Sequence, residues 1–226
     1  MLKKLATLLE TEYGVQVLVI SHDLSASDAP DKIFELLRAK KIEVNYLVNN
    51  AGFAVFGRFA ETNWEEEAEM LTLQVMNYSR LIKLFLPSMI EQRSGHILNI
   101  GSTGSFVPGP YCAAYCAAKS YVLSLSEALY AELKGTGVKV TAVCPGGTKT
   151  AFGGGLYQDR SKRGMAKVME ARTVAEQAYS AMIKGKRLCI PGLVNRFQVF
   201  MLRFLPRKII INVAEKTMSG YRDLSA

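Results

Sequence analysis

The chain has 226 residues, of which 49% are hydrophobic and 21% are charged. This composition excludes an intrinsically disordered chain, and no apolar run reaches the roughly 18 residues that a membrane-spanning helix needs. The first ten residues, MLKKLATLLE, lack the apolar core of a secretory signal, so we expect a cytoplasmic protein. The cysteines show no paired metal-ligand spacing; we expect reduced core thiols and no metal site, at Cys112, Cys116, Cys144 and Cys189.

Helices and strands are predicted to alternate along the chain, which favours an α/β protein with a parallel sheet covered on both faces. Helices are expected over residues 1–13, 28–40, 64–92, 111–134 and 173–184. Strands are expected over residues 15–20, 44–48, 96–100, 138–143 and 187–190. The length suits one domain over residues 1–226, followed within it by a basic, amphipathic helical tail over residues 193–226.

Three polar side chains form a candidate catalytic group. Tyr115 and Lys119 are four residues apart on a predicted helix and therefore share one face. A nearby ammonium lowers the pKa of a phenol, and such a pair can pass a proton to or from a carbinol oxygen. Ser102 follows a predicted strand, where its hydroxyl could hold the substrate oxygen. Taken alone, Tyr-x-x-x-Lys is more often a solvated surface pair.

The strand ends strengthen this interpretation. Residues 49–52 (Asn-Asn-Ala-Gly) follow one predicted strand, Ser102 follows the next, and Pro145-Gly146 follows the one after. In a parallel sheet these ends lie on the same edge. With Tyr115 and Lys119, these motifs make residues 10–195 resemble the short-chain dehydrogenase/reductase family. The resemblance implies a Rossmann-like, doubly wound parallel sheet.

The resemblance also implies residue roles. Tyr115 resembles the family's catalytic acid/base, and Lys119 resembles its partner, which also binds the nicotinamide ribose. Ser102 resembles the hydroxyl that orients the substrate carbonyl. The expected cofactor contacts, besides Tyr115 and Lys119, are Asp23, Leu24, Asn50, Ala51, Gly52, Pro145, Gly146, Thr148 and Thr150. As alternatives from the residues alone, Asn50 is a turn residue, and Asp23 and Thr150 are helix caps.

The chain departs from the family pattern in the long helix. The family usually has an Asn thirteen residues before the Pro of a Leu-Pro pair, where it holds a proton-relay water. Counting back from Pro87 gives Gln74, and Asn77 lies three residues further on. We expect Gln74 to support an altered relay, with Asn77 in a shifted register as the alternative.

A second departure concerns the cofactor. The family's Gly-rich turn, T-G-x-x-x-G-x-G, does not occur before residue 52, where it would bind the pyrophosphate. The sequence therefore predicts a sheet without the family's first two strands, explained by an upstream start codon, an incomplete sequence or a degenerate paralogue. The cofactor expected from the resemblance is NADP, with NAD as the alternative.

Apolar and aromatic residues dominate the loops that form substrate pockets in this family. Phe106, Tyr111 and Phe152, with Leu156, indicate an apolar carbonyl substrate, although ordinary loop packing has the same composition.

The tail is basic: residues 186–226 contain eight Lys or Arg against two Asp or Glu, within a net charge of +8. Residues 193–213 therefore form either a helix pair packed on the core or another subunit, or a peripheral membrane contact. No nucleic-acid-binding motif is present.

The function expected from these motifs is NAD(P)-dependent interconversion of a carbonyl and a secondary alcohol, carried out by a homo-oligomer. The alternative is a catalytically inactive relative of these enzymes that acts as a binding, scaffolding or membrane-surface module.

Overall fold

The computed structural model describes residues 2–152 and 168–222. Its main sheet contains four parallel strands in the order β1-β2-β3-β6. The strands are β1 (Tyr46–Asn49), β2 (Gly95–Ile100), β3 (Val138–Val143) and β6 (Leu188–Cys189). A second parallel pair joins β4 (Thr148–Lys149) to β5 (Met169–Glu170). The predicted parallel α/β fold is confirmed.

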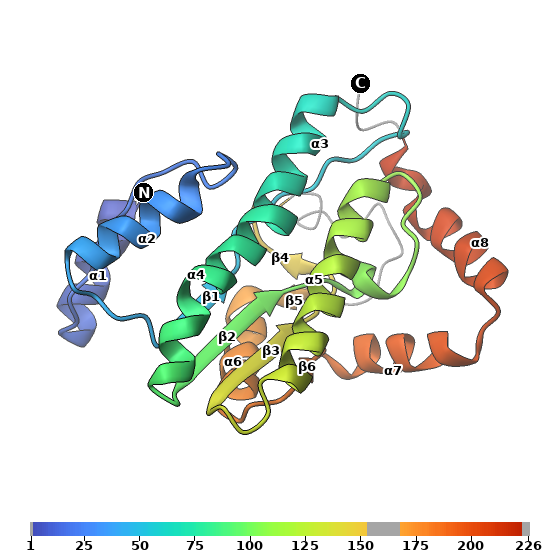
Figure 1. Ribbon diagram of the computed structural model, residues 1–226. Coiled ribbons are helices and arrows are strands. Elements are labelled where there is room, and N and C mark those ends of the chain that lie inside the picture. The colour runs from blue at the N-terminus through green and yellow to red at the C-terminus, as the bar shows by residue number, and fades with distance from the viewer. Residues whose placement is uncertain (1, 153–167, 223–226) are drawn as a thin grey trace.

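Helices connect and cover these strands (Figure 1). They are α1 (Leu2–Tyr13), α2 (Ala29–Ala39), α3 (Trp64–Leu71), α4 (Tyr78–Glu91), α5 (Ala113–Glu132), α6 (Ala171–Ile183), α7 (Leu193–Met201) and α8 (Arg207–Met218). Short 3₁₀ helices are η2 (Thr103–Phe106), η5 (Leu202–Phe204) and η6 (Ser219–Tyr221).

The long helix predicted over residues 64–92 forms, but its middle is wider than an α-helix. A π-helical segment, η1 (Thr72–Asn77), joins α3 to α4. The helix begins at Asn63, whose side chain accepts a hydrogen bond from Glu66 N at 2.9 Å, which satisfies one of the free N–H groups of the first turn. π-helical turns are rare and concentrate at functional sites, and this one contains Gln74.

Two hydrophobic clusters hold the layers together. On one face of the sheet, α4 and α5 pack through the buried side chains Ile82, Phe85, Met89, Ile97, Leu133, Val138 and Val140. On the other face, α6 packs through Leu98, Val143, Ala178 and Met182. The four cysteines are free, and three of them are buried.

The strand predicted over residues 15–20 is wrong: within residues 2–152 and 168–222 this segment is irregular and pairs with no strand. Among the described residues, β1 pairs only with β2 and is the edge of the sheet, and Tyr46 and Val48 on it are exposed. An apolar run becomes a strand only where a neighbouring strand satisfies its N–H and C=O groups.

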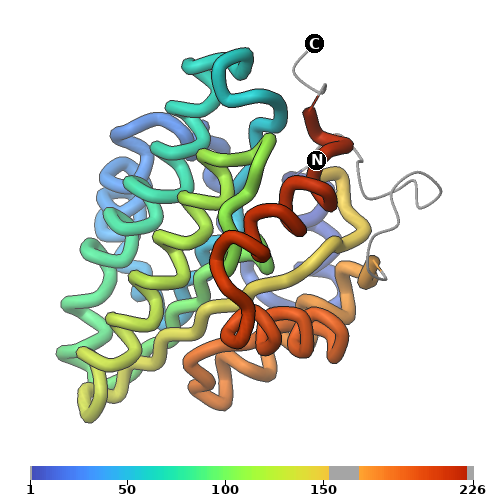
Figure 2. The backbone as a smooth tube through the Cα atoms, turned by 90° about the vertical axis from the view of Figure 1, so that its right-hand side faces the viewer, coloured from blue at the N-terminus to red at the C-terminus, as the bar shows by residue number. Residues whose placement is uncertain are grey.

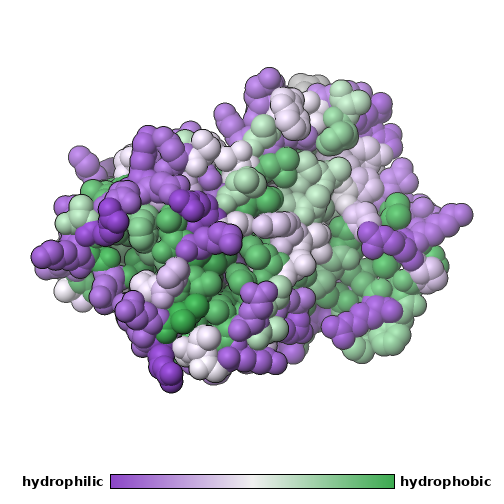
Figure 3. Space-filling model, in the orientation of Figure 1, coloured by the Kyte–Doolittle hydropathy of each residue, from purple (hydrophilic) through white to green (hydrophobic). Residues whose placement is uncertain are grey.

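The tail lies on the side of the molecule opposite α1 and α2, where α7 and α8 form an elbow (Figures 1 and 2). The break between the two helices falls at Pro206, as predicted. Figure 3 shows apolar side chains gathered on this side of the surface, with hydrophilic side chains among them.

Two glycines that separate α5 from β3 provide a test of backbone packing. Gly135 and Gly137 have φ of +82° and +89°. A Cβ at Gly137 would lie 1.9 Å from Arg93 O, whereas a Cβ at Gly135 would meet nothing within 4 Å. We expect Gly137→Ala to lower the free energy of unfolding by at least about 3 kcal/mol, and Gly135→Ala by about 1 kcal/mol. Urea unfolding measures both, and equal losses would contradict the close approach.

Candidate active site

The carboxyl ends of β1, β2 and β3 open into one cavity of about 1810 Å³. Three predicted segments meet there because the strands before them are parallel and adjacent. The predicted site residues that line the cavity are Asn50, Ala51, Gly52, Ser102, Tyr115, Lys119, Pro145, Gly146, Thr148, Thr150 and Phe152. The structure thus brings together the candidate catalytic group and most of the expected cofactor contacts.

Tyr115 is partly buried in the first turns of α5, and its ring lies 5.8 Å from the ring of Phe152, between centroids. Burial raises the pKa of the Tyr115 phenol, while hydrogen bonding with the Ser102 side chain acts in the opposite direction. Loss of solvation is the largest influence on this phenol, and the pKa-lowering role expected for Lys119 stays a prediction. The phenol therefore carries its proton at neutral pH.

Lys119 is buried one turn after Tyr115. Its Nζ donates a hydrogen bond to Ile100 O at 2.8 Å, at the end of β2, and lies 5.7 Å from the centroid of the Tyr115 ring. Burial lowers the pKa of the Lys119 ammonium to about 8. The side chain is therefore fixed beside the phenol and, with a pKa of about 8, still largely protonated at neutral pH.

Ser105, which the sequence analysis missed, ties Ser102 to α5. Its Oγ accepts from Ser102 N at 3.1 Å and donates to Lys119 O at 2.8 Å. Ser102 in turn begins η2, with its Oγ accepting from Gly104 N at 3.0 Å. The Ser-x-x-Ser spacing is typical of a capping box and could have indicated this contact.

A buried polar network behind the cavity was also missed. Asn49 Nδ2 donates to Asn99 Oδ1 at 2.8 Å, and Asn99 Nδ2 donates to Ser126 Oγ at 2.9 Å. These residues belong to β1, β2 and α5, so the network fixes the strand carrying the Asn-Asn-Ala-Gly turn relative to the helix carrying Tyr115. An Asn in the apolar strand HILNI was the available signal.

Gln74 lies in the π-helical segment and is fully buried. Its Nε2 donates to Phe53 O at 2.8 Å, and its Oε1 has no hydrogen-bond partner within the described chain. The alternative residue, Asn77, instead donates from Nδ2 to Leu24 O and Ala26 O, both at 2.8 Å. Gln74 thus holds the segment after the Asn-Asn-Ala-Gly turn, and its role in a proton relay stays a prediction.

The structure does not bring Asp23 or Leu24 to the cavity. The Asp23 carboxylate accepts hydrogen bonds from Ser25 N at 2.9 Å and Ser25 Oγ at 2.7 Å, which lowers the pKa of Asp23. Leu24 lines a separate small pocket with Asn77. Their expected contact with adenine therefore has no support from their position.

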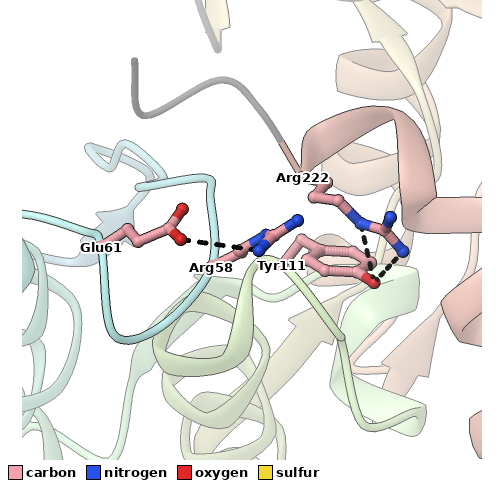
Figure 4. Close-up of polar contacts among 4 residues, drawn as sticks. All are labelled: Arg58, Glu61, Tyr111 and Arg222. Carbon is pink, nitrogen blue, oxygen red and sulfur yellow. Dashed lines mark hydrogen bonds and ion pairs between the residues drawn. The ribbon is translucent and has the colours of Figure 1, made fainter.

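Phe106 and Tyr111 also lie outside the cavity lining. Phe106 packs against a buried cluster that includes Leu123. The Tyr111 hydroxyl accepts hydrogen bonds from Arg222, at 2.8 Å from Nη2 and 3.2 Å from Nε (Figure 4). This contact turns the Tyr111 side chain toward the C-terminal segment, while Arg58 nearby pairs with Glu61 at 3.6 Å (Figure 4). Leu156 lies outside the described residues.

In residues 2–152 and 168–222, no group of three or more His, Cys, Asp or Glu side chains could hold a metal ion. Across the same ranges, every helix is too short or too polar to cross a bilayer.

Comparison with known proteins places these features in context. A family model described as short chain dehydrogenase matches residues 1–161. The "Inactive 2-(S)-hydroxypropyl-CoM dehydrogenase 2" of Xanthobacter autotrophicus is 43% identical over 100 residues, which are 44% of each chain. The 1-deoxy-11-beta-hydroxypentalenate dehydrogenase of Streptomyces exfoliatus is 29% identical, covering 76% of this chain and 63% of that protein. The chain thus matches about half of the length of these curated relatives.

A solved structure agrees with the fold. The structure of a short-chain dehydrogenase from Sphingobium yanoikuyae in complex with NADPH is 29% identical to this chain, with a TM-score of 0.77. The alignment covers 100% of this chain and 84% of that one.

Burial of Lys119 makes stability depend on pH. Its pKa is about 8 in the folded chain against an ordinary 10.5, so between these values the unfolded chain binds more protons. The contribution of Lys119 to stability therefore rises with pH, by about 1.5 kcal/mol between pH 8 and pH 9.5. It is measured as the difference between wild type and variant, because the raised pKa values of the Cys112, Cys144 and Cys189 thiols act in the opposite direction. We expect Lys119→Met to remove this rise in urea unfolding measured across the range. The same substitution at exposed Lys134 is the control, and a wild-type slope retained by Lys119→Met would refute the assignment.

Proposed function

Because this chain belongs to the short-chain dehydrogenase family, we propose that it is a nicotinamide-dependent oxidoreductase that interconverts a carbonyl and a secondary alcohol. The observation that carries the proposal is the convergence of Ser102, Tyr115 and Lys119 on one cavity at the carboxyl ends of three parallel strands. Separate elements hold the three side chains, and each is fixed by hydrogen bonds or burial before any ligand arrives, as catalysis by positioned groups requires.

Each of the three residues has a distinct role. Tyr115 donates its phenolic proton to the carbonyl oxygen during reduction, because its raised pKa keeps it protonated at neutral pH. Ser102 donates or accepts a hydrogen bond at the same oxygen. Lys119, fixed on Ile100 O, places positive charge beside the phenol, which stabilises the phenolate left after proton transfer.

The residues of the cavity fit the nicotinamide end of a dinucleotide. Asn50, Gly52, Lys119, Thr148 and Thr150 present amide, backbone, ammonium and hydroxyl groups to the same space. A bound nicotinamide coenzyme supplies or accepts the hydride. NADP is the preferred coenzyme in this proposal, with NAD as the alternative, and the relative solved with NADPH supports it. The Asp23 carboxylate, expected to contact the adenine of the coenzyme, lies outside the cavity and accepts a hydrogen bond from Ser25.

An apolar substrate fits the remaining part of the cavity. Its lining includes the aromatic and aliphatic side chains of Phe53, Val55, Phe56, Phe152, Val174 and Met182. Apolar walls with a few convergent polar groups are typical of sites for small apolar ligands. We therefore propose an apolar ketone or its secondary alcohol.

A second function has support from one relative. The protein that shares 43% identity over 100 residues is named inactive. A member that has lost turnover would keep the fold, and the same cavity would then serve to bind a small molecule without converting it.

Coenzyme titration and turnover together test the proposal. We expect the chain to bind NADPH in calorimetry and to oxidise it in the presence of apolar ketones, followed at the nicotinamide absorbance. Tyr115→Phe should lower kcat by roughly 10²–10⁴-fold while the Kd for NADPH changes little, because the proton-transfer step loses its acid while the other expected coenzyme contacts remain.

The matched control is Tyr121→Phe, an exposed tyrosine on the same helix, which should keep full activity. A folded chain that binds neither NADPH nor NADH would refute the oxidoreductase, and one that binds without turnover would favour the non-catalytic function.

A further inference from the structure

The outer surface of α7 and η5 carries an exposed apolar stripe. Its members are Leu193, Phe197, Phe200 and Phe204, which are 80%, 64%, 52% and 65% exposed. They follow one another at separations of four, three and four residues, so they share one helical face. The rings of Phe200 and Phe204 meet edge to face, with centroids 5.3 Å apart. The stripe is therefore continuous along both elements.

The opposite face of α7 is fixed to the protein. Asn195 and Val199 are buried, and Asn195 Nδ2 donates to Pro191 O at 2.7 Å. The same side chain packs against Gly146, since a Cβ built there would lie 2.7 Å from Asn195 Nδ2. The helix therefore cannot turn its apolar stripe inward without losing these contacts, and the stripe stays in solvent.

Cations border the stripe, and no carboxylate offsets them. Arg196 and Arg203 lie beside it on the helix, and Arg207 and Lys208 follow at the start of α8. All four are exposed, and within the described residues none forms an ion pair. The sequence from Leu193 to Val213 contains no Asp or Glu. The surface is thus apolar at its centre and positive at its edge.

We propose that this face binds the surface of a membrane that contains anionic lipids. Exposed Phe and Leu side chains enter the boundary between headgroups and acyl chains, while Arg and Lys contact the lipid phosphates. A second copy of the chain fits less well. A symmetric contact would bring the same cations of two copies together with no acidic side chain in the segment to pair with them.

Vesicle flotation with the full chain tests the proposal. We expect binding to vesicles of phosphatidylcholine with phosphatidylglycerol, and little binding to phosphatidylcholine alone. Phe197→Ser combined with Phe204→Ser should weaken binding by at least about tenfold, because apolar area no longer leaves water. Arg196→Gln combined with Arg203→Gln should weaken it by about tenfold and reduce its sensitivity to salt.

Two control variants match these changes in kind. Phe59→Ser removes an aromatic side chain that is equally exposed, at 67%, and Lys3→Gln combined with Lys4→Gln removes two exposed charges from α1. Both should bind as the wild type does. Circular dichroism confirms that each variant is folded, and no catalytic readout is needed.

Three outcomes would overturn the proposal. One is failure of the wild type to bind anionic vesicles, and another is equal binding of the Phe197→Ser/Phe204→Ser variant. The third is a wild-type dimer in sedimentation velocity that the same variant dissociates, with no vesicle binding, which would assign the face to a second copy.

Discussion

Lys119 is attached to the sheet at two points, and the geometry of the cavity depends on this attachment. Its Nζ donates to Ile100 O at the end of β2, and its own carbonyl oxygen accepts from Ser105 in η2, the short helix that follows the same strand. Both contacts join α5 to the carboxyl end of the sheet. Because Tyr115 lies one turn earlier on α5 and Ser102 three residues before Ser105, the two contacts also set the phenol and the hydroxyl beside each other. Burying the ammonium is unfavourable, as its lowered pKa indicates, and the hydrogen bond to Ile100 O offsets part of that cost.

The amide network extends the same attachment across the sheet. Asn49, Asn99 and Ser126 connect β1, β2 and α5 through buried hydrogen bonds. Such bonds stabilise a fold modestly, but removing one partner leaves a buried polar group unsatisfied, which is costly. The network therefore specifies one register of α5 on the sheet. Tyr115 on α5 and Asn50, directly after β1, both line the cavity, so this register brings them to the same space.

The sequence correctly predicts the helices and strands that depend only on the pattern of neighbouring residues. The strand over residues 138–143 is predicted from its apolar run, and the parallel direction of the sheet is predicted from the alternation of helices and strands. Both are confirmed. The segment over residues 15–20 has the same local pattern but no partner strand, and pairing is not visible in a run of residues. Phe106 and Tyr111 show the same limit in the loops. Their composition is that of a pocket, but Arg222, more than a hundred residues away, holds the Tyr111 hydroxyl.

The shift of the Tyr115 pKa also depends on tertiary contacts that the sequence pattern does not contain. The spacing of Tyr115 and Lys119 correctly places an ammonium near the phenol, but the balance between charge and burial depends on tertiary packing that the spacing does not contain. Burial acts on both groups, raising the pKa of the phenol and lowering that of the ammonium. With a pKa of about 8, Lys119 is still largely protonated at neutral pH, so its charge lies beside the phenol when a carbonyl oxygen takes the phenolic proton.

Asn195 links this site to the basic tail. It packs against Gly146, in the segment that lines the cavity, while the opposite face of its helix carries the exposed apolar stripe. One helix thus contacts the candidate active site on one side and solvent on the other. An apolar substrate that reached the protein from a lipid surface would then arrive beside the helix that borders its site.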